Sequence, residues 1–118
     1  MSTLDAGDVK ITLDDTEVTL KSTLRAVQMI SAHFVPNGLA GARQALVAQD
    51  FNAAVAVIRH GLNLADTQAA RLPERVWRNF NVPLVMQLIR YVSLLANGGK
   101  PLPDEPVDDA EPLPPGNA

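Results

Sequence analysis

A chain of 118 residues with a net charge of −3 and no cysteine suits a single domain, and it excludes disulfides, thiolate chemistry and cysteine-based zinc sites. Apolar residues make up 47% of the chain, which is enough for a modest core. The first residues lack the basic flank and apolar run of a secretory signal, so a cytoplasmic protein is the simplest expectation.

Residues 1–7 show no pattern, and we expect a flexible lead-in there. Apolar and polar residues then alternate on both sides of Asp14-Asp15, which predicts a β-hairpin. A two-residue turn at this dipeptide places all the apolar side chains on one face. The pairs it predicts are Leu13–Thr16, Ile11–Val18 and Val9–Leu20. Aspartate does not adopt positive φ freely, so a looser turn through Thr16 is the alternative.

Two helices are expected after the hairpin, because apolar residues recur with the helical period. The first covers about residues 23–34 and is capped by Ser22. Its expected buried stripe is Leu24, Val27, Ile30 and Phe34, with Met29 beside it. Val35-Pro36-Asn37-Gly38 is expected to end this helix. The second helix follows at about residues 39–47, and its inward residues are expected to be Leu39, Ala42 and Leu46.

Asp50 is expected to cap a third helix, which Gly61 ends or loosens. The residues it buries are expected to be Phe51, Ala54, Val55, Ile58 and Leu62. Residues 63–72 are ambiguous, and a turn of helix after Asp66 is one interpretation. Pro73 then starts a short basic helix to about Phe80, with Val76 and Phe80 inward and Trp77 partly exposed.

The last helix, residues 81–98, organises the predicted fold. Asn81 is a suitable N-cap, Pro83 fits the first turn, and Gly98 can adopt the left-handed conformation that ends a helix. Between these ends the helix is apolar nearly all round, which indicates a core helix, and it is too short to span a membrane. We therefore predict an α+β domain at residues 8–100, in which an N-terminal β-hairpin precedes about four to five short helices packed around a hydrophobic C-terminal helix.

Residues 101–118 differ sharply from the rest of the chain. They hold five acids and no Lys or Arg, so they carry −5 and residues 1–100 carry +2. They also hold six of the nine prolines. Such a segment cannot bury enough apolar area to offset the entropy of ordering it. We expect a disordered acidic tail, which either only keeps the protein soluble or also binds a partner.

No residue pattern predicts catalysis, a metal site or a cofactor. Asp14 and Asp15 are expected to be solvated turn residues without shifted pKa values, rather than an acid–base pair. His33 and His60 lie on different predicted helices with no acid at ligand spacing, so we interpret them as helix-end residues rather than metal ligands or proton shuttles.

Arg71, Arg75 and Arg78 form the densest basic cluster, and Trp77 lies among them. Three arginines release few counterions, so a solvated helix face is favoured over a nucleic-acid contact. A helix-turn-helix formed by the second and third helices is a minor alternative. The third helix begins Phe-Asn-Ala-Ala, which offers no basic edge to read bases.

Three segments together, residues 9–23, 51–62 and 94–101, resemble the small tail-assembly chaperone family of gene transfer agents and long-tailed phages of α-proteobacteria, whose members are sometimes labelled tail tube proteins. They are the hairpin, the third helix and a Gly-Gly helix end, and the resemblance spans about residues 8–103. Asp15 stands where we would expect Gly in the hairpin turn of this family.

The resemblance implies a non-catalytic protein of the host cytoplasm. It would bind the apolar helices of a tape-measure protein and help to recruit the tail-tube protein. It would need no cofactor and would bind neither nucleic acid nor a membrane. Self-association is possible in this family. Because aromatic residues dominate interface energetics, the candidate partner-binding residues are Trp77, Tyr91 and Phe34. The alternatives are a structural component of the tail tube and, after it, a helix-turn-helix nucleic-acid-binding protein.

Overall fold

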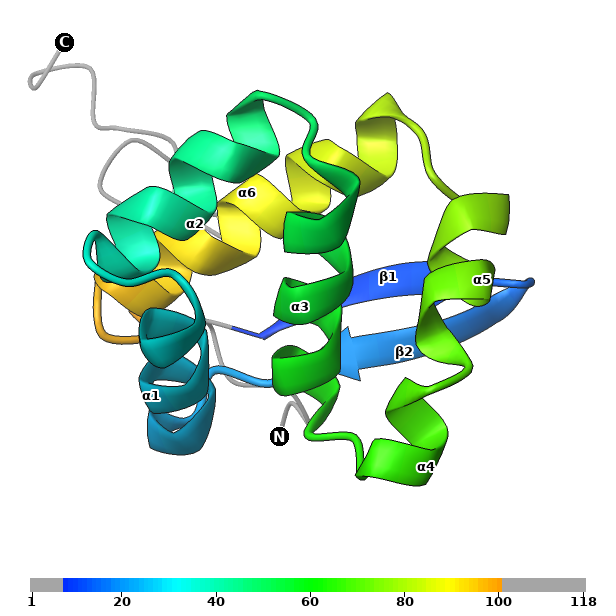
Figure 1. Cartoon of the computed structure of the whole chain (residues 1–118), viewed down its shortest axis with the longest axis horizontal. Coiled ribbons are helices and arrows are strands. Elements are labelled where there is room, and N and C mark those ends of the chain that lie inside the picture. The colour runs from blue at the N-terminus through cyan, green and yellow to red at the C-terminus, as the bar shows by residue number, and fades with distance from the viewer. Residues whose placement is uncertain (1–7, 101–118) are drawn as a thin grey trace, which may run out of the picture.

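The computed structural model describes residues 8–100, and the expected lead-in (1–7) and acidic tail (101–118) lie outside the described residues. The described chain is an α+β domain, as predicted (Figure 1). Its elements, in order, are β1 (Val9–Leu13), β2 (Thr16–Leu20), α1 (Leu24–His33), α2 (Gly38–Val47), α3 (Phe51–Leu62), α4 (Asp66–Ala69), α5 (Leu72–Arg78) and α6 (Val82–Ala96).

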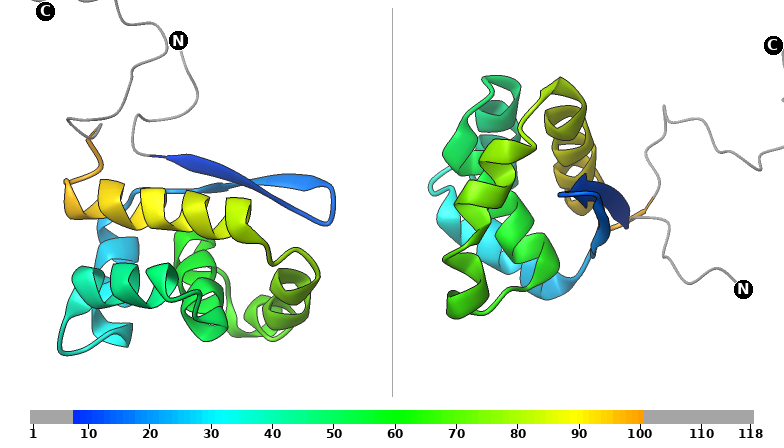
Figure 2. Two further views of the ribbon diagram at one scale, coloured as in Figure 1. Left: turned by 90° about the horizontal axis from the view of Figure 1, so that it is seen from above. Right: turned by 90° about the vertical axis from the view of Figure 1, so that its right-hand side faces the viewer.

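The elements form two layers around one core. Figure 2 shows α6 and the hairpin side by side on one side of the molecule, with α1, α2, α3 and α5 on the other. β1 packs against α6, and β2 packs against α3. Each strand of the hairpin thus contacts a different helix, which meets the need of a two-stranded sheet for a covering layer.

The hairpin has the predicted register, with Ile11 opposite Val18 and Leu13 opposite Thr16. Val9, Ile11 and Leu13 are buried, so the apolar face meets the helices. The looser turn through Thr16 is wrong, because Asp14 and Asp15 alone form the loop, with φ values of 52° and 63°. Two-residue hairpin loops favour positive φ at both positions, and here aspartate supplies it in place of glycine.

The predicted ends of α6 are confirmed. The side chain of Asn81 accepts a hydrogen bond from the backbone N–H of Leu84 at 2.8 Å. At the other end Gly98 and Gly99 have positive φ, and their N–H groups donate to the carbonyls of Leu95 and Leu94. This pair of bonds is a Schellman motif, which satisfies the last carbonyls and turns the chain away from the helix axis.

The burial of α6 differs from the prediction of an apolar helix enclosed on all sides. Its buried residues are Leu84, Val85, Leu88, Tyr91, Val92, Leu94 and Leu95. Val82 and Met86 are 59% and 62% exposed, because α2, α3 and β1 cover the other sides of the helix. Among residues 8–100, none of the helices has both the length and the apolar character needed to cross a membrane.

Two details of α1 were predicted wrongly. The N-cap is Thr23, whose hydroxyl accepts from the backbone N–H of Ala26, whereas the N–H of Ser22 donates to the Asp8 carboxylate. Leu24 is exposed, because it lies about 120° around the helix axis from the buried Ile30. Ala26 takes its place in the buried stripe, and Val27 and Phe34 pack at its border.

The predictions for α2 and α3 are confirmed in part, because Ala54 and Ile58 of α3 are buried, whereas Leu39 of α2 and Phe51, Val55 and Leu62 of α3 are only partly buried. Ala42 and Leu46 of α2 are buried, and Asp50 caps α3 through the N–H of Ala53. Gly61 lies inside α3, which ends instead at Asn63 in the left-handed conformation. A Cβ atom at Gly61 would lie 2.9 Å from Cδ2 of Leu20, so glycine is needed for the close approach of α3 to β2.

Residues 63–72, which the sequence left ambiguous, contain α4. This helix begins at Asp66, in agreement with the interpretation of a turn of helix there. α5 covers residues 72–78 rather than 73–80, and Val76 is buried as predicted. α5 packs against α3, and its last turn lies near the tip of the hairpin (Figure 1).

Candidate functional site on α5

The tip of the hairpin is bound to α5 through one carboxylate. Asp14 accepts hydrogen bonds from Nη2 of Arg78 at 2.7 Å and from Nε of Arg75 at 3.3 Å. Asn79 completes the contact, because its Nδ2 donates to Asp14 at 3.0 Å and its Oδ1 accepts from the Asp14 backbone N–H. We call these four residues the Asp14 clamp. It fixes the last turn of α5 against the turn of the hairpin.

The clamp corrects the prediction that Asp14 is a solvated turn residue with an ordinary pKa. Hydrogen bonds from the Arg78 guanidinium and then the Asn79 amide hold the pKa of the Asp14 carboxyl far below its usual range. Both donors favour the charged form of the carboxyl. Its partners lie more than 60 residues away in the sequence, so no local pattern predicts them.

An Asp14→Asn substitution tests the clamp, because asparagine keeps the turn conformation and removes the charge. We expect a lower melting temperature at neutral pH. The folded-state pKa of Asp14 lies below its unfolded value, so the stabilisation is present above about pH 4 and is lost as the pH falls further. The melting temperatures of wild type and variant should therefore approach each other progressively as the pH falls below about 4.

Asp15→Asn is the matched control, since Asp15 adopts the same conformation and no hydrogen bond or ion pair of its side chain is recorded within residues 8–100. It should leave the melting temperature nearly unchanged. Equal effects of the two substitutions at neutral pH would contradict the clamp.

Next to the clamp lies the most exposed aromatic side chain of the described residues. Trp77 is 69% exposed, yet its ring is held at an angle of 84° to that of Phe51, with the ring centroids 6.0 Å apart. Phe51 in turn meets Phe80 edge to face at 5.4 Å. We call Phe51, Trp77 and Phe80 the aromatic cluster. Phe51 and Phe80 pack on the core, so they fix the position of the exposed ring.

Further apolar surface follows the cluster along the chain. Val82 and Met86 begin α6 two and six residues after Phe80, and both are exposed. Residues four apart lie on the same side of a helix, so the two side chains share one face. The ends of α5 and α6 thus present aromatic and aliphatic side chains that no element within residues 8–100 covers.

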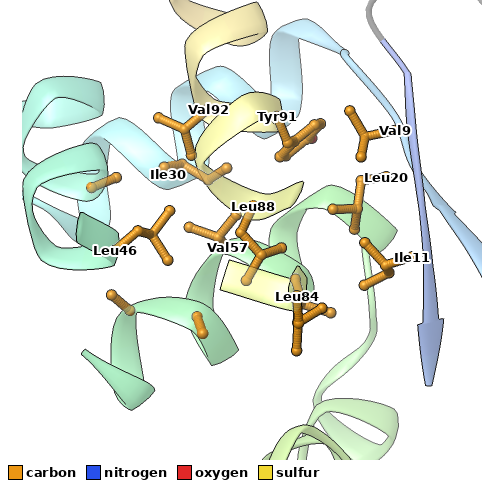
Figure 3. Packing of buried hydrophobic residues seen from close by; sticks show 14 of the residues in the cluster. Val9, Ile11, Leu20, Ile30, Leu46, Val57, Leu84, Leu88, Tyr91 and Val92 are labelled. Carbon is orange, nitrogen blue, oxygen red and sulfur yellow. The ribbon is translucent and has the colours of Figure 1, made fainter. Parts of the chain in front are cut away.

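The three candidate partner-binding residues do not form one site. Trp77 is exposed, as predicted. Tyr91 is fully buried in α6, and its hydroxyl donates a hydrogen bond to the backbone carbonyl of Lys21. Burial also raises the pKa of the Tyr91 hydroxyl above its usual value. Its assignment as a surface anchor is therefore wrong, since its ring contacts the core (Figure 3).

Phe34 lies apart from Trp77, at the end of α1. It is half-buried and meets the ring of His33 at 4.8 Å. His33 neighbours His60 near the end of α3, whereas Trp77 contacts Phe51 at the start of the same helix. Nine residues of helix, about 14 Å, separate those two positions. Phe34 and Trp77 therefore belong to different surfaces.

The structure brings His33 and His60 together from separate helices, with ring centroids 6.3 Å apart. Within residues 8–100, no group of three or more His, Cys, Asp or Glu could hold a metal ion. Burial, and then the positive charge of Arg59, lowers the pKa of His60. Both effects favour the neutral form of the His60 imidazole.

The basic cluster of α5 is largely neutralised. Arg75 and Arg78 pair with Asp14, and Arg78 also binds Glu74 at 2.9 Å. Arg71 is exposed just before α5 begins. In the helix-turn-helix alternative, the start of α3 would be presented to the bases, but Ala53 and Ala54 at this start are buried. The charge that a nucleic-acid backbone would require is thus mostly balanced by carboxylates on the same surface.

A shallow groove of about 330 Å³ lies between β1 and the start of α6. Its lining residues are Lys10, Ile11, Thr12, Asn79, Asn81, Pro83, Leu84 and Gln87. Lys10 is the only ionisable residue among them, and its ammonium group pairs with Glu17 at 3.4 Å. The groove offers amides and a hydroxyl but no adjacent acid and base.

Comparison with known proteins identified no matching family model, no similar curated protein and no similar solved structure.

Proposed function

We propose that this protein is a non-catalytic tail-assembly chaperone of a phage or gene transfer agent, which binds the tape-measure protein in the host cytoplasm and assists assembly of the tail-tube protein. The proposal takes its family from the resemblance of residues 9–23, 51–62 and 94–101. The observation that supports it is the exposure of Trp77 on a braced aromatic cluster.

The physical argument is that a chaperone of this kind must offer apolar surface without collapsing on itself. An exposed tryptophan supplies a large contact area, and its ring is held by Phe51 before any partner arrives. A preorganised side chain loses less conformational entropy on binding. Exposed Val82 and Met86 on α6 add apolar area to which the apolar face of a partner helix can bind.

A Trp77→Ala substitution tests this function. Since most of the ring already faces water, we expect the free energy of unfolding to change by about 1 kcal/mol or less. Capture of a tape-measure fragment should weaken by more than about 1 kcal/mol, as expected for an interface hot spot. The two measurements are chemical unfolding of each variant alone and a binding titration with the co-expressed fragment.

Val35→Ala is the matched control, because Val35 is 74% exposed and follows α1, on the Phe34 side of the molecule. It should leave both stability and capture unchanged. A Trp77 variant that captures the fragment normally would refute the role of the aromatic cluster, and so would a Val35 variant that is equally impaired.

The alternative of a structural tube component is separated by mass spectrometry of purified particles. A chaperone should be absent or scarce in the finished tail, whereas a tube subunit should approach the abundance of the capsid protein. Tube proteins depend on long strands for ring contacts, and within residues 8–100 the two strands have five residues each. High abundance in the particle would overturn the chaperone proposal.

A further inference from the structure

The ring of Trp77 has the properties of a surface that binds proline-rich segments. It is 69% exposed, and Phe51 and Phe80 hold its position from the core side. Proline-rich segments bind to exposed aromatic rings, because the polyproline II conformation is already formed before binding and costs little entropy. A ring that is both exposed and fixed therefore suits a ligand of this class.

The chain itself contains two Pro-x-x-Pro sequences, both after Lys100. Residues 103–106 read Pro-Asp-Glu-Pro and form the inner motif, whereas residues 112–115 read Pro-Leu-Pro-Pro and form the outer motif. The inner motif has two acids between its prolines. The outer motif is apolar at all four positions, so it is the one whose side chains suit an aromatic ring.

The lengths also select the outer motif. Figure 1 shows α5 beside the start of α6, whereas the segment after residue 100 follows the opposite end of this helix. α6 has 15 residues and is about 22 Å long. In the polyproline II conformation, the six residues from Lys100 to Pro106 span about 19 Å, and the twelve residues to Pro112 span about 37 Å. The inner motif therefore ends short of Trp77, and the outer motif can reach it.

The surface of α5 next to Trp77 also suits an acidic segment. A hollow of about 510 Å³ lies there, and its lining residues are Ala70, Arg71, Glu74, Arg75 and Arg78. These three arginines face two carboxylates, those of Asp14 and Glu74, so the surface keeps one positive charge. Five acids precede the outer motif, with no Lys or Arg among residues 101–118. Opposite charge thus favours the approach of this segment to α5.

We propose that the outer motif, residues 112–115, binds over the ring of Trp77 in its own chain and covers it until a partner displaces it. The motif is tethered to the domain, so its effective concentration at the ring is high even though the contact is small. The contact itself does not depend on the proposed chaperone function. Its consequence, competition with the tape-measure protein for Trp77, rests on that function.

The fluorescence of Trp77 provides a direct test, because it is the only tryptophan of the chain and residues 101–118 contain no aromatic residue. The test variant of the full-length chain carries four substitutions: Pro112→Ser, Leu113→Ser, Pro114→Ser and Pro115→Ser. Acrylamide quenches an indole ring only where it can contact it. If the outer motif covers Trp77 in half of the molecules, quenching should be about twice as strong in the variant as in the wild type.

The inner motif gives a matched control with the same number of prolines and leucines removed. Its substitutions are Pro101→Ser, Leu102→Ser, Pro103→Ser and Pro106→Ser. Both variants leave residues 8–100 and the net charge unchanged, and urea unfolding should show equal stability. We expect wild-type quenching in the control. Equal quenching of the wild type and the 112–115 variant would overturn the proposal, as would an equal increase in both variants.

Dilution separates contact within one chain from contact between copies. Binding within one chain does not depend on protein concentration, so the difference in quenching should be the same at about 1 μM and about 50 μM protein. A difference that disappears on dilution would assign the outer motif to the Trp77 of a second copy and would overturn binding within one chain.

The competition is measured separately, by titrating each full-length chain with the tape-measure fragment. At half occupancy of the ring, the 112–115 variant should bind the fragment about twice as tightly as the wild type and the control. Equal affinity of all three chains would overturn the competition. A fragment that none of the chains binds would count against the chaperone function, whereas the quenching result would still decide the contact.

Discussion

An Ile11→Asp substitution is expected to lower the free energy of unfolding by about 3 kcal/mol or more. Ile11 is 4% exposed and lies in the middle of β1, with its side chain directed at the core between Leu20 and Leu84 (Figure 3). A carboxylate at this position would lose its hydration among aliphatic neighbours and would find no cation on the same face. The fold would have to open at the hairpin or protonate the acid.

Chemical unfolding, followed by circular dichroism, measures this effect, and a variant already unfolded in buffer would satisfy the prediction. Thr12→Asp is the matched control, since Thr12 is the next residue of β1 and its side chain is exposed on the opposite face. It faces Glu17 across the strands, so a loss of about 1 kcal/mol or less is expected. Equal losses at positions 11 and 12 would show that the faces are assigned wrongly.

The parts of the fold that the sequence predicts are those with local causes. The alternation of residues 9–20 sets both the register and the buried face of the hairpin, because a slip of one residue would expose the whole apolar set. Asp50 and Asn81 cap their helices through N–H groups only three residues further on. The Gly98-Gly99 helix end depends on hydrogen bonds to residues no more than five positions earlier.

The sequence predictions were wrong for residues whose surroundings depend on which distant element packs against them. Tyr91 is an aromatic residue in a helix, and its sequence context does not say whether a partner or the chain itself covers it. In the structure its neighbours are Gly61 of α3 and the backbone of Lys21 after β2. Leu24 shows the opposite case. A helical apolar pattern places it in the buried stripe, although no element within residues 8–100 covers that side of α1.

The candidate site on α5 also combines a feature with a local cause and features that depend on distant contacts. The exposure of Trp77 could be predicted, because arginines flank it on a short helix. Its support by Phe51, and the Asp14 clamp that holds α5, join residues 26 and more than 60 positions apart. Those contacts exist only once the hairpin, α3 and α5 have packed, so a sequence pattern alone does not reveal them.

A Leu88→Ala substitution is the second large effect that we expect, with a loss of about 2–5 kcal/mol in the free energy of unfolding. Leu88 is fully buried in α6, and Figure 3 shows it near the centre of the core, beside Val57 of α3. Because α2, α3 and β1 all pack on α6, the surrounding side chains cannot collapse easily into the space that the leucine leaves. The loss therefore includes a cavity cost in addition to the lost transfer free energy.

Met86→Ala is the matched control on the same helix, two residues away and 62% exposed. Its loss should be about 0.5 kcal/mol or less, since alanine is a strong helix former and little buried area is removed. Urea titrations of both variants and the wild type give the comparison, with unchanged slopes as a check that unfolding stays two-state. A loss of less than about 1 kcal/mol at Leu88, or a larger loss at Met86 than at Leu88, would show that α6 does not turn this face to the core.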